Sequence, residues 1–193
     1  MDKKTAYIVS SIILISAVII FAWPDTRDEV VVPPIVQTST STPQTLKSYQ
    51  NIEHSIGFVY PSTYTLTQKE LGNAERKHLR ITLVSDTTVR ENSEGPTSIN
   101  FDIYQNNLDK QTIASWVKNY SESNFKQSVV EGKYASTTVA GKEAITYTWD
   151  GLYQGDSYVF AHATNIIMAS VTYLTPEDTI KKDFETILSN LKL

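Results

Sequence analysis

The sequence predicts an α+β fold in which a central antiparallel β-sheet is flanked by helices, preceded by one N-terminal transmembrane helix. Several short segments alternate apolar and polar residues, which is the period of half-buried strands. Two other segments place apolar residues at helical spacing. An uncharged apolar run opens the chain. Strand runs joined by short turns, with helices late in the chain, favour an antiparallel sheet over a parallel, doubly wound one.

Residues 1–23 are predicted to form a short cytoplasmic stub and a signal anchor. The nineteen residues that follow Lys3 and Lys4 carry no charge. As a helix they span about 28 Å, close to the ~30 Å hydrocarbon core of a bilayer. The preceding lysines favour a cytoplasmic N-terminus, so that residues 24–193 lie outside the cell membrane. The residues assigned to the anchor are Tyr7, Ile13, Leu14, Ile19 and Trp23.

A cleaved signal peptide is the alternative for this segment. Signal peptides have an apolar region of roughly 7–15 residues that ends in an A-x-A-like site. Here the run is longer, and a cut after Ala22 leaves the bulky Ile20 three residues from the cut. A retained, single-pass anchor is therefore the favoured interpretation.

Residues 24–48 are predicted to be an extended linker. They hold four of the seven prolines, no glycine and the polar tract TSTST. Proline-rich segments favour the polyproline II conformation, whose rise of about 3.1 Å per residue gives this linker a reach of roughly 75 Å.

Residues 49–193 carry the pattern of the sheet. Alternation is clear in LRITLV (79–84) and SINFDIY (98–104), and GFVYP (57–61) is a strand that a proline ends. Pro61 lacks the N–H that a ladder needs, so this strand is expected to stop at a sheet edge or strand end. Turns are expected at Val139–Lys142 and at Thr164–Asn165.

Two helices are predicted in the same domain. In residues 108–125, apolar side chains recur at helical spacing and Asp109 is a candidate N-cap. In residues 175–193, Thr175 is the candidate cap and Pro176 suits the first helical position.

Four segments resemble the PsbP-like domain family: YQNIEHSIGFVYP, TIASWVKN, VAGKEAITYTW and DFETILSNLKL. The second differs from the family pattern, with alanine and serine where larger residues are usual. The resemblance covers residues 49–193 and implies an α/β/α sandwich with a central antiparallel sheet. The family includes photosystem II extrinsic subunits, a Ran-binding protein of nuclear transport and many anchored bacterial proteins of unknown role. This chain is most similar to the last group.

Composition and motifs leave little room for chemistry. The chain has no cysteine, which excludes disulfides and thiolate chemistry, and its net charge of −4 comes without a basic run for nucleic acid. HExxH, GxSxG, Walker and GxGxxG motifs are absent. We therefore expect no catalytic residues, no cofactor and no metal, and hence a protein that is not an enzyme.

Two weaker candidates remain. Gly155-Asp156-Ser157 resembles the motif of GDS-type esterases, but no histidine follows His162, so a hydrolase that uses Ser157 is the third-ranked function. Glu53 and His54 form a possible cation pair. A metal site normally needs three or four ligands, and adjacent strand residues point to opposite faces, so no metal is expected there.

Aromatic residues are concentrated between Tyr147 and Phe160. Ile145, Tyr147 and Trp149 share one strand face, which favours burial under a helix. The candidate partner-binding residues are Trp149, Tyr153 and Tyr158. The leading hypothesis is a membrane-anchored, extracytoplasmic, non-enzymatic domain that binds or stabilises a protein partner at the cell surface. A small-ligand-binding or sensory ectodomain is the alternative, and the oligomeric state stays open.

Overall fold

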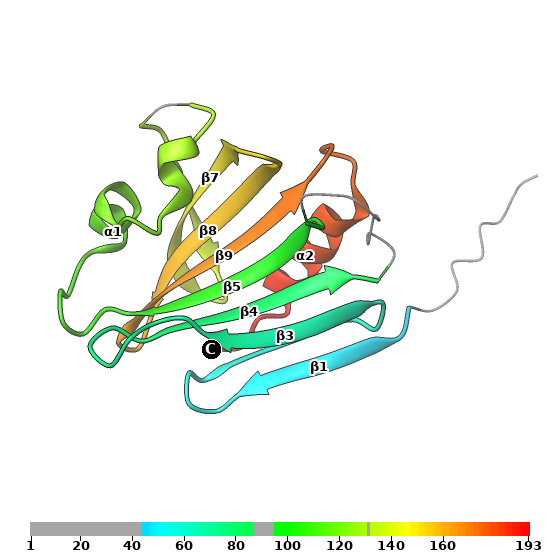
Figure 1. The fold of residues 1–193 in the computed structure, drawn as a ribbon, viewed down its shortest axis with the longest axis horizontal. Helices are drawn as coiled ribbons and strands as arrows, with labels where there is room; N and C mark the ends of the chain where they lie inside the picture. The colour runs from blue at the N-terminus through cyan, green and yellow to red at the C-terminus, as the bar shows by residue number, and fades with distance from the viewer. Residues whose placement is uncertain (1–43, 87–94, 131) are drawn as a thin grey trace, which may run out of the picture. The chain divides into compact units, whose positions relative to one another are not determined.

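The computed structural model describes residues 44–86, 95–130 and 132–193. Antiparallel strands are the main secondary structure of this part of the chain, together with two α-helices and one 3-10 helix (Figure 1). The elements are β1 (Leu46–Asn51), β2 (Ile56–Pro61), β3 (Tyr64–Glu70), β4 (His78–Ser85), β5 (Ser98–Gln105), α1 (Ile113–Asn119), the 3-10 helix η1 (Asn124–Gln127), β6 (Ala135–Val139), β7 (Lys142–Asp150), β8 (Gln154–His162), β9 (Asn165–Tyr173) and α2 (Thr179–Ser189).

A seven-stranded antiparallel sheet forms the centre, in the order β3-β4-β5-β9-β8-β7-β6. Strands β1 and β2 form a separate hairpin. The helices α1 and α2 lie on opposite faces of the sheet (Figure 1). The predicted central antiparallel sheet with flanking helices is confirmed.

Two hydrophobic cores lie on the two faces of this sheet. The core on the α2 face is the larger of the two, because the β1–β2 hairpin packs there beside α2. It buries the alternating residues of the predicted strands, among them Leu79, Ile81 and Leu83 of β4 and Ile99, Phe101 and Ile103 of β5. The α1 face holds a smaller core under α1 and η1, which includes Trp116, Phe125, Ile145, Tyr147 and Met168. Burial under helical segments thus confirms the expectation for Ile145 and Tyr147.

The β1–β2 hairpin accounts for the early proline. Pro61 is the last residue of β2 and pairs with Leu46 at the open end of the hairpin. Strand β1 begins at Leu46, within the stretch assigned to the linker. The sequence did not predict this strand, because LKSYQN lacks the alternation of apolar and polar residues that marks a strand. On its other side β2 is bridged to the C-terminal segment, with Gly57 N–H to Lys192 O at 3.0 Å and Lys192 N–H to Gly57 O at 2.8 Å.

Both helices are shorter than predicted. Helix α1 is capped by Thr112, whose Oγ1 accepts from Ser115 N–H at 3.2 Å. Asp109 is not the cap, because its carboxylate is paired with Arg76 at 2.7 Å. The helix stops at Asn119, and the backbone of Tyr120 is extended, so 108–125 is not one helix.

Helix α2 begins at Thr179 rather than Pro176. Residues Thr175–Asp178 instead form a turn, with Asp178 N–H bonded to Thr175 O at 3.1 Å, and Asp178 is the N-cap residue. The Asp178 carboxylate accepts from Leu174 N–H at 2.8 Å. The prediction of Thr175 as the cap is therefore wrong.

The hairpin turns follow the sequence closely. Ala140 and Gly141 connect β6 to β7 with φ of 47° and 75°, within the predicted turn. Two consecutive positive φ angles are typical of a two-residue type I′ hairpin. The β8–β9 turn uses Ala163 and Thr164, one residue earlier than predicted, and Ala163 takes the left-handed conformation with φ 50°.

Within the part of the chain that the structure describes, no helix has both the length and the hydropathy to span a bilayer. The predicted anchor, residues 1–23, and the linker up to residue 43 lie outside the described residues. The anchor, its topology and its cell-membrane location stay predictions.

Candidate functional site

The three predicted partner-binding residues do not share one surface. Trp149 packs on the α1 face against the smaller core, which includes Tyr147. Tyr158 lies on the opposite face, where its ring meets Phe184 of α2 edge-on at 5.8 Å. Tyr153 lies in the β7–β8 turn and donates its hydroxyl hydrogen to Gly95 O at 2.6 Å. Trp149 and Tyr153 therefore belong to the same end of the sheet, and Tyr158 is a packing residue under α2.

A polar network fixes the indole of Trp149. Its Nε1–H donates to Ser157 Oγ at 3.0 Å. Ser157 Oγ also contacts the Asn124 amide at 3.0 and 3.1 Å, and Tyr147 O–H donates to Asn124 Oδ1 at 2.6 Å. Burial raises the pKa of Tyr147 to about 12, so its hydroxyl stays protonated and remains a donor. The network holds Trp149 against the sheet in one orientation.

Gly155 provides the space that this orientation needs. Trp149 and Gly155 are cross-strand partners. A Cβ atom on Gly155 would lie 2.4 Å from Trp149 Cζ2 and 2.8 Å from Val171 O. The indole therefore lies directly over the glycine backbone.

This geometry also bears on Ser157. Its side chain is fully buried, and its hydroxyl is bonded to Trp149 and Asn124. No hydrogen bond joins it to a histidine in residues 44–86, 95–130 or 132–193. A nucleophilic serine needs an adjacent base and access to substrate. The observed contacts instead give Ser157 a structural role.

Exposed apolar residues lie next to the end of β7 that carries Trp149. Val129, Val130 and Leu152 are exposed by 61%, 52% and 64%. Val129 N–H bonds to Thr148 O at 3.0 Å, and Leu152 lies in the turn that follows β7. We name Val129, Val130, Leu152 and Trp149 the hairpin-end patch. The sequence offered a signal for Trp149 but none for the valines, which precede β6 in an irregular segment.

A cavity of about 470 Å³ lies beside Tyr153, between the sheet and the start of α2. Polar groups line much of it. Tyr64 O–H donates to Asp183 Oδ2 at 2.8 Å, and burial together with this carboxylate raises the pKa of Tyr64. The volume is within the range of ligand sites, roughly 300–1,000 Å³.

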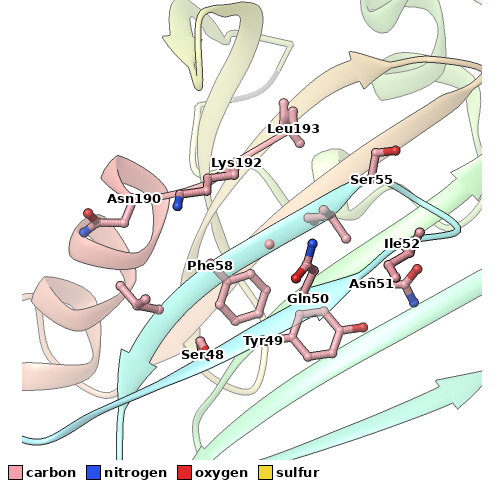
Figure 2. A pocket seen from close by; sticks show the side chains of 13 residues that line it. Ser48, Tyr49, Gln50, Asn51, Ile52, Ser55, Phe58, Asn190, Lys192 and Leu193 are labelled. Carbon is pink, nitrogen blue, oxygen red and sulfur yellow. The ribbon is translucent and has the colours of Figure 1, made fainter.

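A second groove, of about 450 Å³, runs along the β1–β2 hairpin and the C-terminal segment. Figure 2 shows Tyr49 and Phe58 side by side in this groove, with Asn190, Lys192 and Leu193 along another wall. The two rings lie 5.1 Å apart, and Tyr49 O–H donates to Gln68 Oε1 of β3 at 2.6 Å. Sequence reasoning missed the groove because its walls come from the two ends of the domain.

The remaining titratable side chains are distributed over several elements. Glu53 and His54 line a shallow pocket of about 150 Å³ with Lys77, whose Nζ lies 3.7 Å from Glu53 Oε1. His78 Nε2 lies 2.6 Å from Oδ1 of the nearly fully buried Asp102. Among the described residues, His, Asp and Glu side chains form no group of three or more that could hold a metal ion.

No protein-family model and no curated protein matches the chain. Among solved structures, it is similar to the cyanobacterial PsbP (CyanoP) of Synechocystis sp. PCC 6803, with a TM-score of 0.50 and 12% identity. That match covers 83% of this chain and 99% of the other. A protein of Bacteroides thetaiotaomicron VPI-5482 matches at a TM-score of 0.44 and 11% identity, over 76% of this chain and 47% of that one. The CyanoP match confirms the PsbP-like fold that the sequence resemblance implied.

Proposed function

On the premise of this PsbP-like fold, we propose that the protein is a membrane-anchored, non-enzymatic binding module that holds a protein partner at the cell surface. The observation that carries the proposal is the hairpin-end patch. Three exposed apolar residues lie beside the end of β7 that carries a tryptophan. Clustered exposed apolar residues of this kind mark interaction sites more often than isolated ones do.

The rigidity of Trp149 supports a contact of useful strength. Binding normally costs the entropy of each side chain that becomes ordered. Trp149 is already ordered by Ser157 and by its packing on Gly155. Tryptophan is also among the residues that dominate binding energy at interfaces. A partner that covers the patch therefore gains apolar contact with little further ordering of this residue.

The non-enzymatic part of the proposal is supported by Ser157, the one nucleophile that the sequence put forward. Its buried hydroxyl is engaged with Trp149 and Asn124. The anchor rests on the uncharged run of residues 5–23 and on the proline-rich linker that follows it.

Site-specific photo-crosslinking in the native membrane tests the proposal. A photoreactive residue replaces Leu152 in the patch and, as the matched control, the similarly exposed Leu108, which precedes α1. We expect a reproducible protein neighbour from position 152 but not from 108, identified by mass spectrometry. Adding Val129→Asp should abolish that crosslink, because the charge interrupts the apolar surface. Equal labelling from both positions, or none from 152, would refute the proposal.

The cavity beside Tyr153 is the specific observation that favours the ligand-binding alternative. Native mass spectrometry of the full chain, purified in mild detergent, tests it. A bound small molecule that disappears in Thr179→Trp, which fills the cavity, would support a ligand-binding ectodomain. A chain without added mass, or a mass retained in Thr179→Trp, would count against it.

A further inference from the structure

Among residues 44–86, 95–130 and 132–193, the central sheet ends at β6, which pairs with β7 on one side only. The two-residue turn makes Val139 and Lys142 a hydrogen-bonded pair. Pairs in an antiparallel ladder alternate, so Thr137 with Ala144 is hydrogen-bonded as well. The backbone N–H and C=O groups of the residues that alternate with Thr137 and Val139, namely Ser136 and Thr138, therefore point to the open edge. Both residues are exposed.

Strand β6 lacks the usual protection of an edge. Its sequence, ASTTV, contains no charge and no proline, and its side chains are small. By contrast, the edge strand β3 carries Lys69 and Glu70, and β1 carries Lys47. Natural sheets place charged residues, especially lysine, on their edges to prevent strand addition. The β6 edge is thus the one of these three that is open to another strand.

We propose that β6 pairs antiparallel with β6 of a second copy of this chain, centred on Thr137. In this register Ser136 lies opposite Thr138 of the second copy, and Ala135 lies opposite its Val139. Ser136 and Thr138 each exchange two backbone hydrogen bonds with their counterparts, which gives four in total. The two seven-stranded sheets then join into one of fourteen strands. The contact is isologous and therefore closes at two copies.

A second copy is the occupant because the edge is complementary to itself. Rotation about Thr137 matches hydroxyl residues with hydroxyl residues, and the uncharged strand places no like charges opposite each other. Four backbone hydrogen bonds give only weak association in dilute solution. Pairing is therefore expected where copies are concentrated in a membrane. The hairpin-end patch is not needed for this contact, so the inference rests on the membrane anchor of the proposed function and not on its protein partner.

Single-cysteine crosslinking suits this chain, which has no native cysteine. Thr137 faces itself across the axis as a non-hydrogen-bonded pair, for which the Cα atoms are about 4.5 Å apart and within disulfide range. The full chain with Thr137→Cys is placed in membrane vesicles, and an added oxidant accepts two electrons as two thiols lose their protons and form the S–S bond. Ser48→Cys in β1 and Thr67→Cys in β3 are the controls. We expect Thr137→Cys to form covalent dimers about ten-fold faster than either control, or more.

Thr138→Pro, added to Thr137→Cys, removes one outward N–H while leaving the bonds between β6 and β7 intact. It should reduce crosslinking to the control rate, and circular dichroism checks that the domain stays folded. Thr138→Lys, which adds an edge charge without touching the backbone, serves if the proline variant does not fold. Equal rates at all three cysteine positions would mean that only the membrane brings copies together and would overturn the proposal. So would a Thr137→Cys dimer that neither variant weakens.

Discussion

Replacing Gly155 by alanine tests the packing of Trp149 most directly. The new Cβ would lie 2.4 and 2.5 Å from two indole carbons and 2.8 Å from Val171 O. Because the ring and the backbone carbonyl are both rigid, the indole must move by about 1 Å to restore van der Waals contact near 3.5 Å. Such overpacking costs about 1–3 kcal/mol, and loss of the Trp149–Ser157 hydrogen bond adds about 1 kcal/mol. We expect the free energy of unfolding to fall by about 2–4 kcal/mol.

Urea unfolding followed by circular dichroism measures this loss. Gly151→Ala in the same hairpin is the matched control, because its Cβ would meet its nearest atoms at 3.5 Å, an ordinary contact. We expect that variant to stay within about 0.5 kcal/mol of the parent. Trp149→Ala should remove much of the penalty when combined with Gly155→Ala, since the close contact with Val171 O at 2.8 Å is then the one that remains of the three. If Gly155→Ala and Gly151→Ala unfold at the same urea concentration, the packing argument is wrong.

Three further predictions follow from other sites. Asp102→Ala should lower the free energy of unfolding in urea by about 2–3 kcal/mol, because the buried carboxylate accepts hydrogen bonds from both His78 and Arg80. Asp109→Ala breaks an exposed ion pair and should cause no measurable loss in the same titration. Burial, reinforced by Lys142, lowers the pKa of His162 below its ordinary value of 6.5. The unfolded chain therefore binds this proton more readily than the folded one, so the free energy of unfolding should decline as the pH falls below 6.5. The decline should be smaller in His162→Gln, and parallel plots of unfolding free energy against pH for the two proteins would contradict the prediction. Ala140→Asn should raise Tm by about 2–4 °C in a thermal melt, because asparagine tolerates the left-handed conformation of this turn at about 1 kcal/mol less than alanine; an unchanged Tm would refute this.

The sequence predicted best where side-chain periodicity decides the structure. The apolar residues Leu79, Ile81 and Leu83 alternate with polar ones because one face of β4 is buried. This alternation alone identifies the strand. Strand β1 has no such pattern, since its pairing with β2 rather than its own apolar face holds it in place. The prediction of one helix over residues 108–125 was wrong for a related reason. Apolar residues have helical spacing there, but Asp109 forms an ion pair with Arg76, a residue far away in the sequence, and does not cap the helix.

The candidate site depended on a register that the sequence does not reveal. Trp149 pairs with Gly155, and Thr146 pairs with Tyr158. This parity places Tyr158 on the α2 face and Trp149 on the α1 face. A turn one residue longer or shorter would have shifted every side chain of β8 to the other face. The local aromatic pattern was therefore visible, but its division between two surfaces was not.

The position of β9 has a consequence for how the domain folds. The sheet contains two meanders of sequential strands, β3–β4–β5 and β6–β7–β8–β9, and they meet where β9 is bonded to β5. Each meander can form from local contacts, but the two are joined in the ladder through the pairing of β5 with β9. Long-range pairing of this kind slows folding, because loop closure must precede the contacts that compensate it. The pairing of β9 with β5 is therefore expected to be the step that turns two separately formed halves into one cooperative unit.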